Sequence, residues 1–163
     1  MILGIFKTMM SPFRALVALA LLAGCSGEPG PAFEIVGGGF IFNYRIAEVT
    51  AGLVVVPLRE FPADSLVEMT FENPAGEAPI IVAKTASPKT KRLDFVTPPL
   101  SGVEADRDYA VSVRLIDGQG KEIERIDKKF RSQLDQSRLP DAPLTIGPGY
   151  APNPQNAPDA AKP

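Results

Sequence analysis

The stretch DYAVSVRLIDGQGKEIERIDKKFR, residues 108–131, decides the fold class of this chain. In its first part, small or polar residues alternate with apolar ones, at Tyr109, Val111, Val113 and Leu115. Strict alternation predicts a β-strand with one buried face. The glycines of 117–120 permit a tight hairpin turn, because glycine adopts positive φ without strain. The returning strand is dense in charge, as expected for a protected sheet edge.

Similar short patterns precede this hairpin, separated by turn-forming Gly and Pro residues. They lie at 40–46, 53–56, 67–71, 80–83 and 93–95. We expect Leu53–Val56 to be buried on both faces and to end at Pro57, and Gly37–Gly39 to form a hinge or bulge. The one helix-like segment, 132–138, is short. About seven short strands within 33–133 predict an all-β fold, a single immunoglobulin- or fibronectin-III-like β-sandwich.

The segment that leads into the 108–116 strand adds to this prediction. Val103 lies six residues before Tyr109, which resembles the tyrosine corner of fibronectin-III and immunoglobulin-like domains. The resemblance implies that the Tyr109 hydroxyl forms a hydrogen bond with the chain near the start of its strand. Ala105 stands where those domains usually have proline, and the chain has no Trp. The match therefore favours a sandwich without selecting one superfamily.

The N-terminus predicts export and lipidation. Lys7 and Arg14 precede an apolar run, 15–23, which is too short to span a bilayer and is typical of a secretory signal that begins at Met1, Met9 or Met10. The run ends in Leu22, Ala23, Gly24 and Cys25.

These four residues resemble the lipobox of bacterial lipoproteins. The resemblance implies removal of 1–24, a diacylglycerol thioether on Cys25 and a further acyl chain such as palmitate. Two or three acyl chains anchor a protein stably, whereas one does so marginally. Residues 25–32 then form a lipidated, Gly/Pro-rich tether. Ser26 follows the cysteine where Asp would favour retention, so we expect the outer membrane, facing the periplasm.

The C-terminal segment, 134–163, is rich in proline and poor in apolar residues, which predicts an extended or disordered tail. Within it, Leu144, Ile146 and Tyr150 stand among prolines and glycines. Such a segment suits an extended ligand for a groove or sheet edge, so these three residues are candidates for binding a partner. A spacer, or a strap over the chain's own sandwich, is the alternative.

A second resemblance covers Val55 to about Arg131. The motif residues are Arg59, 61–69, Ala78-Pro79, Leu93, Phe95, Pro98, 106–111 and Arg114. They resemble small lipoproteins of the YbaY and type III secretion pilotin kind. The resemblance implies a role in binding or escorting an envelope protein. The additional N-terminal strand and the proline-rich tail depart from that pattern.

Composition argues against several kinds of function. The chain has no histidine, which removes the commonest general base and metal ligand, and its single cysteine excludes an internal disulfide. The formal net charge of −2 gives no reason to expect a nucleic-acid partner. We expect no catalytic residue, metal or cofactor, and therefore no enzyme.

Several groups of residues are candidates for chemistry or for binding a ligand. A calcium site would use Glu104, Asp106 and Asp108. A glycosidase would pair carboxylates such as Asp94 and Glu124. Nucleophile candidates are Ser65, Ser87, Ser101 and Ser112. Basic contacts to lipid headgroups or peptidoglycan would come from Lys84, Lys89, Lys91 and Arg92. Solvated turns and strand ends explain each group more simply.

The sequence therefore predicts a non-enzymatic envelope lipoprotein that binds a protein partner, as a pilotin-like or chaperone-like assembly accessory does. One alternative is a structural module associated with the cell wall or a glycan. The absence of Trp speaks against it, because glycan sites favour exposed aromatic platforms. A hydrolase is the other alternative, and the lack of histidine speaks against that.

Overall fold

The computed structural model describes residues 30–156, and these residues form an all-β protein. The strands are β1 (Phe33–Asn43), β2 (Glu48–Pro57), β3 (Ser65–Phe71), β4 (Ile80–Ala86), β5 (Leu93–Val96), β6 (Asp108–Ile116), β7 (Glu122–Arg131), β8 (Thr145–Ile146) and β9 (Ala151–Pro152). Short 3-10 helices cover Gln136–Arg138 and Pro154–Asn156. No helix among the described residues is long and apolar enough to cross a membrane.

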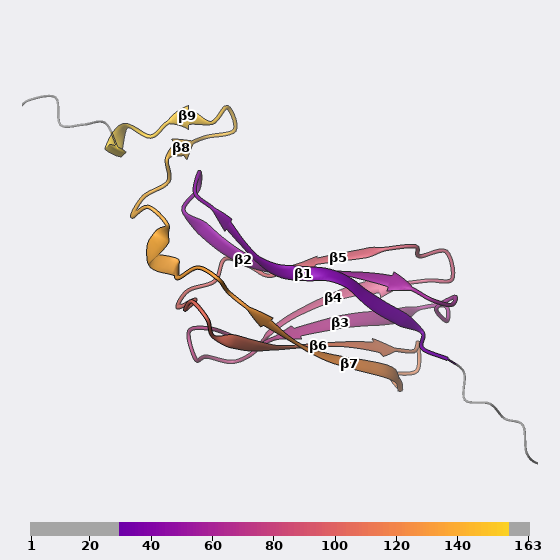
Figure 1. Ribbon diagram of the computed structural model, residues 1–163. Coiled ribbons are helices and arrows are strands. Elements are labelled where there is room, and N and C mark those ends of the chain that lie inside the picture. Colours follow the sequence, from indigo (N-terminus) through magenta and orange to yellow (C-terminus); the bar gives the residue numbers. More distant parts are fainter. Residues whose placement is uncertain (1–29, 157–163) are drawn as a thin grey trace, which may run out of the picture. The chain divides into compact units, whose positions relative to one another are not determined.

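Strands β1 to β7 form two antiparallel sheets. One has the order β1-β2-β5 and the other β4-β3-β6-β7. Figure 1 shows them as two layers, with β1, β2 and β5 lying over β3, β4, β6 and β7. The predicted all-β class and the sandwich-like arrangement are therefore confirmed. Alternation produces this result because each sheet must bury one apolar face, and the two apolar faces cover each other.

The core lies between the sheets and is built from alternate residues of the strands. In β3 and β6 the buried and less buried positions alternate along nearly the whole strand. The largest fully buried side chains include Tyr109, Phe33, Phe61, Phe71 and Phe95. Phe40 packs edge-to-face on Tyr109 with ring centroids 5.2 Å apart, which joins β1 of one sheet to β6 of the other.

The strand, turn and return strand predicted within 108–131 form a hairpin, whose register shifts between Leu115 and Ile116. β6 pairs with β7 from Asp108 opposite Arg131 to Ile116 opposite Glu122. The turn closes through hydrogen bonds from Lys121 and Gln119 backbone N–H groups to the Asp117 carboxylate. β7 lies at the edge of its sheet, where its charged side chains were expected.

Two predictions about residues 44–56 are wrong. Tyr44 and Ile46 were expected in a strand, but they lie in the turn between β1 and β2, where Ala47 has a φ of +56°. Leu53–Val56 is not buried on both faces: Leu53 and Val55 are buried, whereas Val54 and Val56 are only half-buried. An outer sheet face that no other layer covers leaves alternate residues partly exposed.

The glycines at 37–39 lie inside β1 rather than before it. The register of β1 on β2 shifts between Ile35 and Gly37, as a β-bulge does, so the bulge alternative describes this segment. Gly38 has a packing role as well. A Cβ atom at Gly38 would meet the Phe130 ring of β7 and, at 3.0 Å, the Gly52 carbonyl oxygen.

The described part of the tail, residues 134–156, has more structure than the extended or disordered segment we expected. It contains the two 3-10 helices and the antiparallel pair β8–β9. Composition is a poor guide here, because the pairing depends on side-chain amide contacts rather than on buried apolar area.

Candidate functional site

The predicted lipidation site lies outside the described residues. Cys25 and the preceding Leu22, Ala23 and Gly24 all fall within 1–29. Cys25 lipidation and cleavage before it therefore stay predictions, and the described candidates begin with the tail hairpin.

The tail hairpin, residues 143–153, is held together by its polar ends. The Asn153 backbone N–H donates to the Leu144 carbonyl oxygen at 3.0 Å, and the Asn153 side-chain amide donates to the Pro143 carbonyl at 2.7 Å. Asn153 is buried. At the tip, the Tyr150 N–H donates to the Gly147 carbonyl at 3.2 Å. Two strands of two residues each do not hold a hairpin alone, so Asn153 closes it.

A second set of contacts fixes this hairpin to the β1–β2 turn. The Thr145 backbone N–H donates to the Arg45 carbonyl oxygen at 3.1 Å. The Arg45 guanidinium carbon lies 5.2 Å from the centroid of the Tyr150 ring, within the range of a cation–π contact. The Thr145 hydroxyl also donates to the Arg45 carbonyl oxygen, at 3.4 Å. The hairpin is thus tied to the sandwich by two hydrogen bonds to one carbonyl and by one side-chain stack.

The three candidate partner-binding residues are all exposed on this hairpin. Leu144 and Ile146 are each 45% exposed, and Tyr150 is 59% exposed. Tyr44 and Ile46, in the turn that carries Arg45, are exposed as well. The structure therefore brings apolar side chains from two distant parts of the sequence to one end of the domain. Grouped exposed apolar side chains mark interaction surfaces more often than single ones do.

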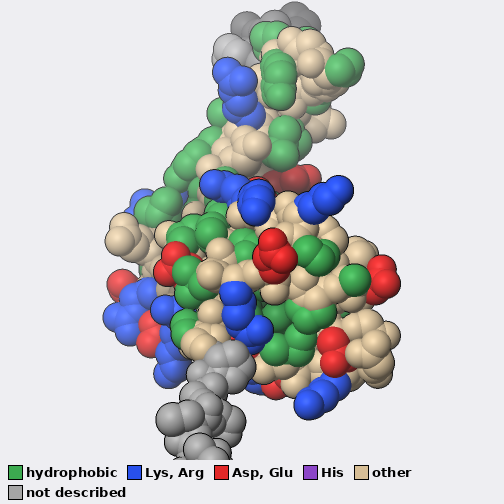
Figure 2. Space-filling view, turned by 90° about the vertical axis from the view of Figure 1, so that its right-hand side faces the viewer, with side chains coloured by type: hydrophobic (Ala, Val, Ile, Leu, Met, Phe, Trp, Pro, Cys, Tyr) green, Lys and Arg blue, Asp and Glu red, His purple; other side chains and the backbone are tan. Residues whose placement is uncertain are grey.

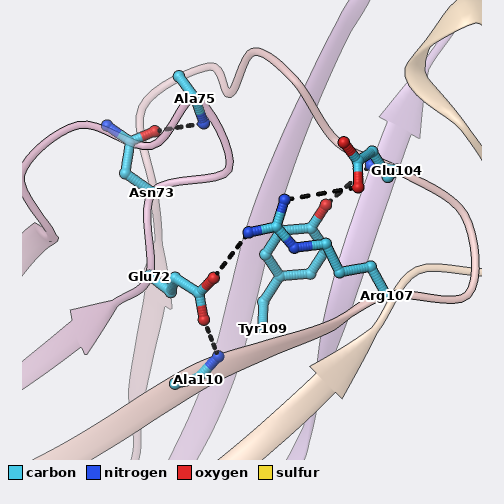
Figure 3. A network of polar contacts seen from close by, with 7 residues as sticks. All are labelled: Glu72, Asn73, Ala75, Glu104, Arg107, Tyr109 and Ala110. Carbon is cyan, nitrogen blue, oxygen red and sulfur yellow. Dashed lines mark hydrogen bonds and ion pairs between the residues drawn. The ribbon is translucent and has the colours of Figure 1, made fainter.

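The two corner residues identified from the sequence, Val103 and Tyr109, both lie in the hydrophobic core. Val103 is buried, and the Glu104 backbone N–H donates to the buried Tyr109 hydroxyl at 2.8 Å. Figure 3 shows Arg107 lying over the Tyr109 ring between two carboxylates. Arg107 donates to Glu72 at 3.0 Å, and Glu72 also accepts the Ala110 backbone N–H at 2.9 Å. This network fixes the loop before β6 to the end of β3, which is a structural role.

The acidic residues around this loop are engaged by arginines. Glu104 pairs with Arg107, and Asp108 with Arg131 at 2.7 Å. The hydrogen bond from Arg131 holds the pKa of Asp108 below its usual value. Among residues 30–156, no group of three or more Asp, Glu, His or Cys side chains is arranged to hold a metal ion. The geometry thus gives no support to calcium binding at Glu104, Asp106 and Asp108.

The candidate nucleophiles and the carboxylate pair are not assembled into a site. The Ser65 hydroxyl is buried and donates to the Pro62 carbonyl at 2.8 Å. Ser112 lies in the floor of an open hollow of about 830 Å³ on the outer face of the four-stranded sheet, beside Thr70 and Ala110. Asp94 and Glu124 belong to different sheets. The lining of the hollow also includes charged side chains, among them Glu72, Arg125 and Asp127.

The basic residues near β5 do not act as one free cluster. Arg92 donates hydrogen bonds to Asp94 from both its Nε and its Nη2 atoms, and these hold the pKa of that carboxyl below its usual value. The Lys84 Nζ lies 5.8 Å from the centroid of the Phe95 ring. Lys89 and Lys91 are exposed in the loop between β4 and β5. On the face seen in Figure 2, cationic side chains lie among anionic and hydrophobic ones.

Two residues of this region escaped prediction from sequence. Arg45 accepts two hydrogen bonds from Thr145 and stacks on Tyr150, and Asn153 closes the hairpin. Arg45 follows Tyr44 in the sequence, and nothing in that pair indicates a binding role, because the residues that Arg45 contacts, Thr145 and Tyr150, lie about a hundred residues further along the chain. The Asn153-Pro154 pair does signal a turn, and that signal was available.

No protein-family model and no curated protein matches the chain. Several solved structures resemble it weakly. OgpA from Akkermansia muciniphila matches with 12% identity over 66% of this chain and 30% of that one, at a TM-score of 0.37. A family 76 glycoside hydrolase from a bovine Bacteroides thetaiotaomicron strain matches with 14% identity over 60% and 20%, at 0.35.

The third is an endonuclease/exonuclease/phosphatase from Beutenbergia cavernae, with 12% identity over 61% of this chain and 35% of that one, at 0.31. The chain spans only about a third or less of the length of each structure. Resemblances this weak say nothing about function.

Proposed function

We propose that this chain is a bacterial envelope lipoprotein, anchored through Cys25, that binds a protein partner with its tail hairpin. The observation that carries the proposal is the exposure of Leu144, Ile146 and Tyr150 on a hairpin that is itself held in place. A surface whose backbone is already fixed loses less conformational entropy on binding than a flexible segment does. The role is that of a non-enzymatic assembly accessory, in the manner of a pilotin or chaperone, and the absence of enzymatic activity stays a prediction.

The sandwich serves as a spacer in this proposal. Strand order, three strands as β1-β2-β5 and four as β4-β3-β6-β7, together with the Glu104–Tyr109 hydrogen bond, supports a fibronectin-III-like type. β1 begins at Phe33, close to the tether, and leads directly to the turn that carries Arg45. Eleven strand residues at about 3.3 Å each extend for about 35 Å. This strand length separates Phe33 from the turn that carries Arg45 and the hairpin. In this proposal the hairpin meets its partner on the periplasmic side of the outer membrane.

Lipidation is tested by labelling cells that express the full chain with an alkyne-bearing fatty acid. We expect label on the wild-type protein and its recovery with outer-membrane fractions. Cys25→Ser should carry no label and should leave the membrane fraction. Equal labelling of both proteins would refute the anchor at Cys25.

Partner binding is tested by placing a photo-crosslinking amino acid at position 146 of the full chain in living cells. We expect one discrete adduct, which a combined L144S and Y150S substitution abolishes. The matched control substitutes Val36 and Val96, two apolar residues of β1 and β5 with similar exposure, and should leave the adduct intact. An adduct that survives the hairpin substitutions, or no adduct at all, would refute the hairpin as the binding surface.

One observation favours a glycan as a second candidate. Tyr44 and Tyr150 are the large exposed aromatic side chains among residues 30–156, and both flank Arg45. Two tyrosines beside a guanidinium give a small stacking surface for sugar rings. Co-sedimentation of the full chain with purified peptidoglycan tests this: retention that is lost in a Tyr150→Ala variant would favour the glycan, and no retention would remove it.

A further inference from the structure

Arg45 is the one charged residue in the two segments that form the exposed apolar surface at the hairpin. These segments are the turn residues 44–47 and the tail hairpin, residues 143–153, and neither contains another Lys, Arg, Asp or Glu. Arg45 is exposed, and so are the large apolar side chains of the same two segments, Tyr44, Ile46, Leu144, Ile146 and Tyr150. The hairpin and its turn therefore present an apolar surface with a single positive charge.

The Arg45 guanidinium is oriented but not neutralised. Its central carbon lies 5.2 Å from the centroid of the Tyr150 ring. Thr145 donates only to the Arg45 backbone carbonyl, so the guanidinium takes no part in those hydrogen bonds. Among residues 30–156, no carboxylate forms an ion pair with Arg45, whereas other arginines do so, namely Arg92, Arg107, Arg114, Arg125 and Arg131. The N–H groups of the Arg45 guanidinium are therefore available to a ligand.

Backbone strain lies on both sides of the contact between Arg45 and Tyr150. Tyr150 has a φ of +53° and Ala47 a φ of +56°, in the left-handed region that residues with a Cβ atom seldom adopt. Glycine would adopt this conformation without strain, and the chain has glycines at 147 and 149, yet a tyrosine occupies position 150. Strained residues of this kind cluster at ligand-binding sites. The strain thus supports a binding role for the surface that these residues flank.

We propose that Arg45 binds a carboxylate of the protein partner, so that the hairpin recognises an acidic residue flanked by apolar side chains. This inference rests on the proposed function, because it names the chemistry of the partner that the hairpin binds. A guanidinium matches a carboxylate through two parallel hydrogen bonds, and an aromatic ring beside it restricts its orientation before binding. Arg and Tyr are also enriched among the residues that contribute most to protein–protein binding.

The surroundings of Arg45 specify the rest of the partner segment. Because no charge of the hairpin or the turn opposes Arg45, charge complementarity selects an Asp or Glu on the partner. The exposed Leu144 and Ile146 side chains select apolar residues next to that acid. Contact between these apolar groups also excludes water from the ion pair, which strengthens it.

Selection of peptides on the full chain, purified in detergent, tests this specificity. The probe is a displayed library of random peptides of uniform length. We expect the wild type to enrich peptides with Asp or Glu between apolar residues, Arg45→Gln to lose the acidic preference, and Arg45→Glu to select Lys or Arg instead. These substitutions keep the Arg45 carbonyl and therefore the acceptor for Thr145. Arg59→Gln is the matched control, because Arg59 is exposed in the loop after β2, and it should select as the wild type does.

The outcomes separate this inference from the proposed function. Enrichment by the wild type without an acidic position, or an acidic preference that survives in Arg45→Gln, would overturn the role of Arg45 and leave the hairpin as the binding surface. Enrichment that is unchanged by the combined L144S and Y150S substitution would overturn both, and so would the enrichment of no peptide at all.

Titration of one enriched peptide distinguishes recognition from anchoring of the hairpin. Its matched copy carries Asn or Gln at the acidic position. We expect the wild type to bind the acidic peptide about ten-fold to a hundred-fold more tightly than the copy, as charge-assisted hydrogen bonds do, and Arg45→Gln to bind both equally. If Arg45 only anchored the hairpin, Arg45→Gln would weaken both peptides alike and keep their ratio, which would overturn the proposal. If proteolysis shows that Arg45→Gln loosens the hairpin, Arg45→Lys decides instead: it keeps the charge beside Tyr150 but not the paired donors, and should lower the ratio.

Discussion

Replacing Tyr109 by Phe removes one oxygen atom from a partly buried hydrogen bond of the sandwich. The Tyr109 side chain is fully buried, and its hydroxyl accepts the Glu104 N–H at 2.8 Å. Phe keeps the ring and therefore its packing on Phe40 and Phe71. The loss is then one hydrogen bond plus the partly desolvated N–H left behind. We expect the free energy of unfolding to fall by about 1–2 kcal/mol, because a net hydrogen bond contributes about 1 kcal/mol and an unsatisfied donor costs somewhat more.

Urea denaturation measures this difference as a lower midpoint, with the dependence of the unfolding free energy on urea concentration unchanged. Thermal unfolding gives a second measurement. For a domain of this size, a loss of about 1–2 kcal/mol lowers the melting temperature by roughly 4–10 °C. Tyr44→Phe is the matched control, because the Tyr44 side chain is exposed in the β1–β2 turn and should lose almost nothing. A Tyr109→Phe protein with the stability of the wild type, or an equal loss in Tyr44→Phe, would refute the view that this hydroxyl holds the loop before β6.

Three further predictions concern packing, pH and the hairpin. Gly38→Ala should lower the free energy of unfolding by about 1–3 kcal/mol through overpacking against β7, whereas Gly37→Ala, with open space at its Cβ, should not show this overpacking loss in thermal melts. The hydrogen bond from Arg131 lowers the folded-state pKa of Asp108 below its unfolded value, so its stabilising contribution is present above about pH 4 and is lost as pH falls through the folded pKa. Urea midpoints for Asp108→Asn should therefore decline less on acidification than those of the wild type, and parallel curves would contradict the ion pair. Asn153→Ala should open the hairpin to proteolysis while the sandwich melts unchanged; unaltered cleavage would show that Asn153 does not close it.

The two-sheet fold could be predicted because its strands signal themselves locally. Tyr109, Val111, Val113 and Leu115 are all buried on one side of β6, so period-2 alternation sufficed there. The turn after β6 is equally local, since Asp117 accepts both turn N–H groups with its own carboxylate. Where a strand's neighbours in sequence are also its neighbours in space, pattern and structure agree.

The prediction failed where the outcome depends on distant parts of the chain. Tyr44 and Ile46 continue the alternation of β1, yet the chain turns at Asn43, which ends the pairing with β2. The tail forms a hairpin because the Asn153 side-chain amide donates to the Pro143 carbonyl oxygen. The hairpin is attached to the sandwich because the Thr145 backbone N–H donates to the Arg45 carbonyl oxygen. Neither contact can be predicted from the composition of the tail or from the periodicity of its apolar residues. The exposed apolar residues of the tail were identified from sequence, but the turn that holds them was not.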